Sequence, residues 1–195
     1  MKSFKPNFLF SVIAGLFMAA SVLAQSPDAT RSTQTRTQPQ TQSFNDTNVN
    51  YTFDLPSVSW KITVKPSPIS PNVEYVYVDK SDGHMDVRKI TIKKGEILSD
   101  TIENEEGRLQ FLQGYVRGKE ETFEGKLKGK VFNYEFVRSS RNMSGRIYFL
   151  KADDTTVYAV RFTGERDKLR SIRAETDSIA RTFEIKTAKL PVAAN

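Results

Sequence analysis

Asp79, Asp82, His84 and Asp86 place three carboxylates and the only imidazole of the chain within eight residues. Carboxylate oxygens and imidazole nitrogens are suitable ligands for a divalent cation. Their spacing does not match an EF-hand loop, and the pair Asp82-Gly83 is typical of a hairpin turn. These four residues are candidate metal ligands, although a solvated hairpin tip explains them more simply.

Other residue types that could carry catalysis give no consistent pattern. Glu103, Glu105 and Glu106 could supply an acid–base pair, but acidic residues are also favoured near the start of a helix. Ser139-Ser140 lacks the Gly-x-Ser-x-Gly pattern of a nucleophile elbow. The chain has no Cys and one His, which excludes disulfides, thiol nucleophiles and multi-histidine metal sites. We therefore expect no catalytic residue, no cofactor and no enzymatic activity.

Basic residues gather in the middle of the chain and form a candidate binding patch, composed of Lys126, Lys128, Lys130, Arg138 and Arg141. Such a patch could bind anionic lipid, polysaccharide or an acidic protein surface. The alternative is an edge strand whose lysines discourage pairing with other chains. A nucleic-acid partner is not expected, because no Gly-rich or aromatic-interleaved binding motif accompanies these residues.

The elements that would position these side chains are mainly strands. Alternating branched and aromatic residues predict strands at 52–55, 58–64, 73–78, 87–92, 130–137, 146–151, 157–163 and 183–185. We expect Asp82-Gly83 to turn one hairpin, Trp60 to anchor the core, and Phe132, Tyr134 and Phe136 to share a face.

Two helices are predicted between these strands. The first has apolar residues at near-helical spacing from Leu98 to Val116, with Ser99 or Asp100 as its cap. The second begins at a Thr163 cap and buries a stripe composed of Leu169, Ile172, Thr176, Ile179 and Phe183. Its opposite face carries Arg166, Arg170, Arg173 and Asp177. The fold class is therefore α+β, a mainly antiparallel twisted sheet covered by helices in an α/β/α sandwich.

The two ends of the chain differ from this domain. Residues 1–24 have a basic start, an apolar stretch and small residues before Gln25, which predicts a signal peptide and an exported, periplasmic or extracellular protein. A membrane anchor is the alternative, but the apolar run is shorter than the roughly 20 residues needed to cross a bilayer. Residues 25–48, rich in Gln, Ser and Thr, predict a disordered linker, 49–187 the globular domain, and 188–195 a flexible tail.

Three short segments resemble the PsbP family. They are the opening Phe53-Asp54-Leu55-Pro56 followed by Trp60, the run from Tyr158 to Gly164, and the ending from Ile172 to Ile185 with Ile179 and Phe183. The resemblance implies a PsbP-like sandwich and a non-enzymatic accessory or binding role, and it transfers no functional residue.

Two functions are carried forward from the sequence. The first is an accessory or protein-binding module of the periplasm or cell envelope, whose partner is an unknown envelope protein. The alternative is a carrier of a small apolar or amphipathic ligand held between sheet and helix. We expect no transmembrane segment after removal of the signal peptide.

Overall fold

A computed structural model describes residues 41–186. The predicted signal peptide (1–24), the linker up to residue 40 and the tail (188–195) lie outside the described residues and stay predictions. The elements are β1 (Gln42–Asn45), β2 (Tyr51–Leu55), β3 (Trp60–Val64), β4 (Val73–Tyr77), β5 (Asp79–Thr91), α1 (Leu98–Leu109), β6 (Val116–Glu124), β7 (Lys128–Arg138), β8 (Arg141–Lys151), β9 (Thr156–Glu165), α2 (Arg166–Ser171), α3 (Arg173–Thr182) and β10 (Glu184–Ile185).

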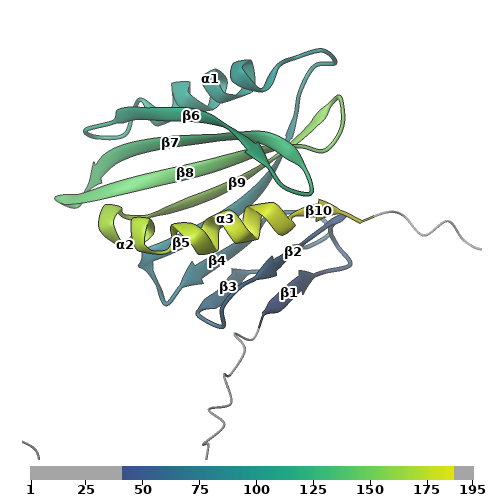
Figure 1. Cartoon of the computed structure of the whole chain (residues 1–195), viewed down its shortest axis with the longest axis horizontal. Coiled ribbons are helices and arrows are strands. Elements are labelled where there is room, and N and C mark those ends of the chain that lie inside the picture. Colours follow the sequence, from purple (N-terminus) through teal and green to yellow (C-terminus); the bar gives the residue numbers. More distant parts are fainter. Residues whose placement is uncertain (1–40, 187–195) are drawn as a thin grey trace, which may run out of the picture. The chain divides into compact units, whose positions relative to one another are not determined.

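A seven-stranded sheet is the centre of the domain (Figure 1), and its strand order is β3-β4-β5-β9-β8-β7-β6. Every neighbouring pair is antiparallel. Strands β7, β8 and β9 are long and rich in branched and aromatic residues, which suit a pleated surface buried on both faces. The predicted fold class, an α+β protein with a mainly antiparallel sheet covered by helices, is confirmed.

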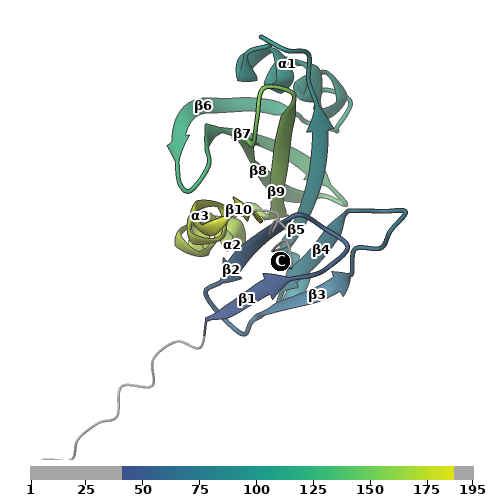
Figure 2. The ribbon, with the colours of Figure 1, turned by 90° about the vertical axis from the view of Figure 1, so that its right-hand side faces the viewer.

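Helices cover opposite faces of this sheet, with α1 on one face and α2 and α3 on the other (Figure 2). Under α1, Ile102 and Leu109 pack on a cluster that includes Phe132, Tyr134 and Phe136, so the predicted shared face of these three aromatic residues is confirmed. Under α2 and α3, the predicted apolar stripe from Leu169 to Phe183 is buried. Both faces therefore have a filled hydrophobic core, which stabilises the sheet.

A second, three-stranded sheet lies on the same face as α3, with strand order β1-β2-β10. Its first strand corrects the predicted boundary, because β1 lies inside the segment that we expected to be a disordered linker (25–48). Phe44, the one large apolar residue of that segment, is buried and stacks on Phe53 with ring centroids 4.7 Å apart. Burial of Phe44 and the pairing of β1 with β2 together stabilise this short edge strand.

The predicted hairpin turn at Asp82-Gly83 is wrong. Both residues lie within β5, and the chain reverses earlier, at Val78, whose φ of 59° is left-handed. Gly83 serves packing instead, because an added Cβ would come within 3.0 Å of Ile172 and 3.1 Å of Tyr77. Gly83 therefore permits the close approach of Ile172 and Tyr77.

Both predicted helices differ from the observed ones in extent. Helix α1 ends at Leu109, and the residues from Val116 onward form the edge strand β6, which was not predicted. Thr163 does not cap a helix, because β9 continues to Glu165. The last helix is interrupted at Ile172 (φ −99°, ψ 17°), which separates α2 from α3.

Candidate functional site

A groove of about 420 Å³ lies between α2, the start of α3 and the strands β6, β7 and β8. Its lining contains five arginines and one carboxylate, that of Glu135. The arginines are Arg117, Arg146, Arg166, Arg170 and Arg173. The charged groups of the site are therefore mainly permanent donors, because the guanidinium group stays protonated at any physiological pH.

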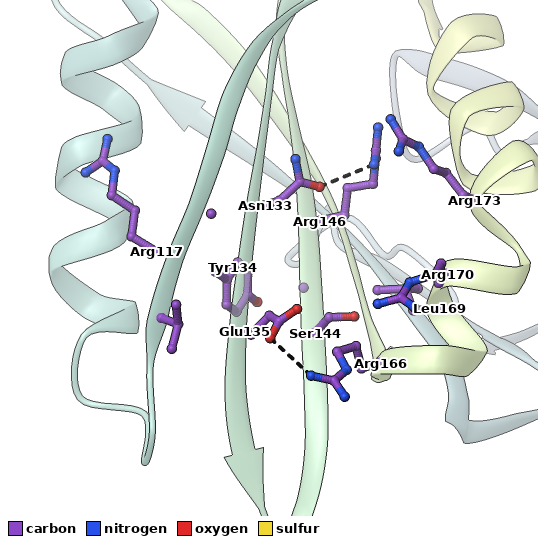
Figure 3. Close-up of a pocket in the computed structure, with 13 residues that line it drawn as sticks. Arg117, Asn133, Tyr134, Glu135, Ser144, Arg146, Arg166, Leu169, Arg170 and Arg173 are labelled. Atoms are coloured by element: carbon purple, nitrogen blue, oxygen red, sulfur yellow. Dashed lines mark hydrogen bonds and ion pairs between the residues drawn. The ribbon is translucent and has the colours of Figure 1, made fainter. Parts of the chain in front are cut away.

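The helical side of the groove follows from residue spacing. Arg166, Leu169 and Arg170 of α2 line it, and steps of three and four residues place side chains on one face of a helix. Arg173, the first residue of α3, continues this wall beyond the interruption at Ile172. Leu169 is buried in the core beneath this face and fixes its orientation. The arginines of α2 and α3 consequently project along one wall of the groove (Figure 3).

Arg146 projects from β8 and is held rigidly. Its Nε donates a hydrogen bond to the Tyr148 hydroxyl (2.6 Å), and its Nη1 donates to Asn133 Oδ1 (3.3 Å). Its Nη2 lies 3.1 Å from Asp177 Oδ1, and only 11% of the side chain is exposed. Burial raises the pKa of the Tyr148 hydroxyl well above its ordinary value. The guanidinium group of Arg146 is therefore a preorganised part of the floor.

The remaining cations on the helical wall are paired only loosely. Arg166 Nη1 lies 3.6 Å from Glu135 Oε2, across the groove in Figure 3, and its Nε is buried without a hydrogen bond among the described residues. Arg170 Nη1 lies 3.6 Å from Asp167 Oδ1, and Arg173 Nε lies 3.9 Å from Asp177 Oδ2. Exposed pairs of this kind contribute little, so a ligand can replace them.

Arg117 lines the groove with its stem only. Its side chain points toward α1 and away from the other arginines (Figure 3), where Nη1 forms an ion pair with Glu106. The Tyr115 hydroxyl donates to the same carboxylate (2.9 Å). Arg117 therefore joins β6 to α1, and the exposed charge available to a ligand comes mainly from Arg166, Arg170 and Arg173.

Tyr134 and Gly145 form the floor where β7 and β8 pair. An added Cβ at Gly145 would overlap the ring of Tyr134, so the absence of a side chain makes room for this ring, which packs in the cluster under α1. Burial raises the pKa of Tyr134 to about 12, which keeps its hydroxyl neutral.

The four candidate metal ligands do not converge. His84 Nε2 lies 3.0 Å from Glu74, Asp86 accepts from Arg161 Nε (2.7 Å), and Asp82 lies 3.4 Å from Lys168. Asp79 accepts hydrogen bonds from Ser81, which lower its pKa. Within residues 41–186 there is no group of three such side chains that could hold a metal ion.

The predicted basic patch is also not one surface. Lys128 and Arg138 begin and end β7, ten residue steps apart, which corresponds to about 33 Å of strand. Lys130 pairs with Glu120, Lys126 with Glu184 and Arg141 with Glu165. The patch residues were close only in sequence, and none of the five lines the arginine groove.

The carboxylates on α1 have structural partners. Glu105 is buried and lies 2.6 Å from Arg88 Nη2, Glu106 pairs with Arg117, and Glu103 is exposed.

No helix of the described chain combines the length and apolar character needed to span a bilayer. A second depression, of about 520 Å³ beside α1, is also lined mainly by polar residues.

No family model matches this sequence, and a comparison with curated protein sequences gives no significant match. Solved structures do match. The cyanobacterial PsbP (CyanoP) of Synechocystis sp. PCC 6803 has a TM-score of 0.51 and 13% identity, over 74% of this chain and 92% of that one.

Two further solved structures match equally well. The Saccharomyces cerevisiae Ran-binding protein Mog1p has a TM-score of 0.51 and 11% identity, over 75% of this chain and 96% of that one. A protein of Bacteroides thetaiotaomicron has a TM-score of 0.52 and 12% identity, over 78% of this chain and 50% of that one. The order of the strands and helices, together with these matches, shows that the chain has the PsbP-like fold.

Proposed function

We propose that this domain is a non-catalytic binding module and that its arginine groove binds an acidic segment of a partner protein. The observation that carries the proposal is the gathering of Arg146, Arg166, Arg170 and Arg173 around a groove whose lining holds one carboxylate. Arginine forms planar, paired hydrogen bonds with carboxylates, and such pairs give both affinity and geometric specificity.

The same residues argue against acid–base chemistry in the groove. A guanidinium group cannot exchange its proton near neutral pH, and Glu135 has no second carboxylate or imidazole beside it in the lining. Protein binding is in keeping with the description of the structural neighbour Mog1p as a Ran-binding protein. The alternative, a carrier of an apolar ligand held between sheet and helix, has less support, because hydrophobic side chains fill the space between the sheet and the helices on both faces.

We place this activity outside the cytoplasm, in the periplasm or cell envelope. The support is the leader-like sequence of residues 1–24, with small residues before Gln25. The N-terminal residue of the protein recovered from fractionated cells tests this placement, and an intact Met1 in the cytoplasmic fraction would contradict it.

A charge-reversal pair tests the groove itself. In the variant Arg170→Glu/Arg173→Glu we expect the affinity for a labelled, glutamate-rich 12-residue peptide to fall at least tenfold, a loss of about 1.4 kcal/mol. The matched control is Lys61→Glu/Lys65→Glu, which changes net charge equally at exposed positions near the opposite edge of the sheet. Fluorescence anisotropy at low and high salt measures both.

The control decides what the result means. Equal losses in the two variants would show attraction by net charge alone and would contradict the groove as the site. Tighter binding of the unmodified protein to anionic lipid vesicles than to the peptide would contradict a protein partner. A loss confined to the groove variant, reduced by salt, supports the proposal.

A further inference from the structure

The two walls of the groove are unequal in charge, and this difference limits what can bind there. The strand wall presents Glu135 and Asn133, two positions apart on β7, and both point into the groove (Figure 3). Glu135 faces Arg166, and the amide of Asn133 accepts from Arg146. No carboxylate of the strand wall faces Arg170 or Arg173, so two exposed guanidinium groups lack a partner on that side.

The spacing of these guanidinium groups indicates the spacing of the missing carboxylates. Arg170 lies in the last turn of α2 and Arg173 begins α3, so the two are three residues apart on either side of the interruption at Ile172. Alternate residues of an extended chain are about 6.6 Å apart and lie on the same side, within reach of two long arginine side chains that begin three residues apart. Adjacent residues of an extended chain point to opposite sides and could not face both arginines.

The size of the groove suits a short extended segment. The groove has a volume of about 420 Å³. Three residues of an extended chain span about 10 Å, so such a segment fits along the wall formed by α2 and the start of α3.

We infer that the groove binds an extended peptide segment in which two acidic residues are separated by one other residue, with the two carboxylates paired to Arg170 and Arg173. The segment lies between α2 and β8, and its intervening side chain turns toward Ser144 and Gly145 of the strand wall. This inference rests on the proposed function and specifies the sequence pattern that the groove selects.

Three labelled pentapeptides of one composition, two glutamates and three serines with blocked ends, test the spacing. The glutamates are adjacent in the first, separated by one serine in the second and by three serines in the third. We expect the second to bind at least fivefold tighter than the other two. In Arg170→Gln and in Arg173→Gln this preference should disappear, while the circular dichroism spectrum stays unchanged.

Glu135→Gln provides a test in the opposite direction. Because the Glu135 carboxylate repels an acidic ligand and occupies Arg166, its neutralisation should increase the affinity for the second peptide two- to fivefold, by about 0.4 to 1 kcal/mol. Glu103→Gln, an exposed position on α1, is the matched control and should leave affinity unchanged.

Equal affinities for the three peptides, or unchanged or weaker binding by Glu135→Gln, would overturn the inference. So would tighter binding of the same spacing in a peptide stapled into a helix. If none of the pentapeptides binds but the 12-residue peptide does, the inference fails and the proposed function stands. If the 12-residue peptide also fails to bind, the proposed function itself is wrong.

Discussion

Individual glycines show how closely the sheet is packed beneath the groove. We expect Gly145→Ala to lower the free energy of unfolding by about 3 kcal/mol, because overpacked cores lose 1–3 kcal/mol or more and the new Cβ would overlap the Tyr134 ring. Thermal denaturation followed by circular dichroism measures the change.

The same substitution at Gly107 should have the opposite sign. Gly107 lies within α1, and an added Cβ would have no atom within 4 Å, so Gly107→Ala should stabilise the protein by about 0.5 to 1 kcal/mol. If Gly145→Ala were as stable as the unmodified protein, the close contact with Tyr134 would not exist in solution.

At the residue scale, sequence reasoning did not find the site. It placed Arg166, Arg170 and Arg173 on the polar face of one helix and gave them no binding role, whereas in the structure they line the groove from α2 and α3. Nothing in the sequence indicated that Arg146 and Glu135 would lie opposite, because two separate strands bring them there. Asp79, Asp82, His84 and Asp86 were grouped by sequence distance, but in the fold each has its own partner.

Helix α1 is joined to the sheet by buried charge as well as by its apolar face. Glu105 pairs with Arg88 of β5, and Arg88 also lies 3.5 Å from Asp86. Glu105→Gln keeps the shape but removes the charge, so Arg88 loses its close anionic partner. We expect a loss of about 1 to 2 kcal/mol, as for other hydrogen bonds to charged groups.

Hydrogen exchange can locate this loss. The amides of α1 should exchange about tenfold faster in Glu105→Gln, because a helix held by few contacts can open locally. The control Glu103→Gln lies on the exposed side of the same helix and should leave exchange unchanged. Uniformly faster exchange across β7 and β8 would instead show that Glu105 stabilises the whole domain.

At the element scale, the missed elements share a physical cause. Strand β6 was not predicted because it is an edge strand with charged residues along most of its length, and so it lacks an alternating apolar pattern. Strand β1 was not predicted because it lies in a polar segment and Phe44 is its one buried residue, which is too few to give an apolar pattern. The long central strands, by contrast, were predicted from their branched and aromatic residues, since burial selects those residue types.

Across the whole molecule, burial raises the pKa of all seven tyrosines. The pKa reaches about 12 for Tyr75 and Tyr134, against 10.0 for the free side chain. A raised folded-state pKa means that the unfolded chain loses these protons first. The resulting stability is fully present below pH 10 and is lost as the pH rises toward 12.

An alkaline titration tests this expectation. Tyrosinate absorbance should rise in one cooperative step above pH 10, together with the loss of the circular dichroism signal. The matched control is the protein in denaturant, whose tyrosines should ionise near their ordinary pKa. Independent ionisation of several tyrosines near pH 10 in the folded protein would contradict the burial described here.

At the scale of the whole molecule, the fold class and the two buried faces could be predicted from sequence, because the spacing of apolar residues indicates which side of each strand or helix faces the core. The interruption at Ile172 could not, because the apolar stripe from Leu169 to Phe183 continues through it. The groove depends on this region, where α2 gives way to α3, and on the pairing of distant strands. The relative positions of elements that are distant in sequence cannot be predicted from the spacing of residues within each element.

The pairing of β2 with β10 has a consequence for the order of folding. Thr52 pairs with Glu184, and the rings of Tyr51 and Phe53 are covered by Phe183, which comes near the end of the chain. A nascent chain that has not yet released α3 and β10 from the ribosome cannot close this side of its core. Folding must therefore wait until synthesis is nearly complete, and during that interval the emerging chain exposes aromatic surface that a chaperone could bind.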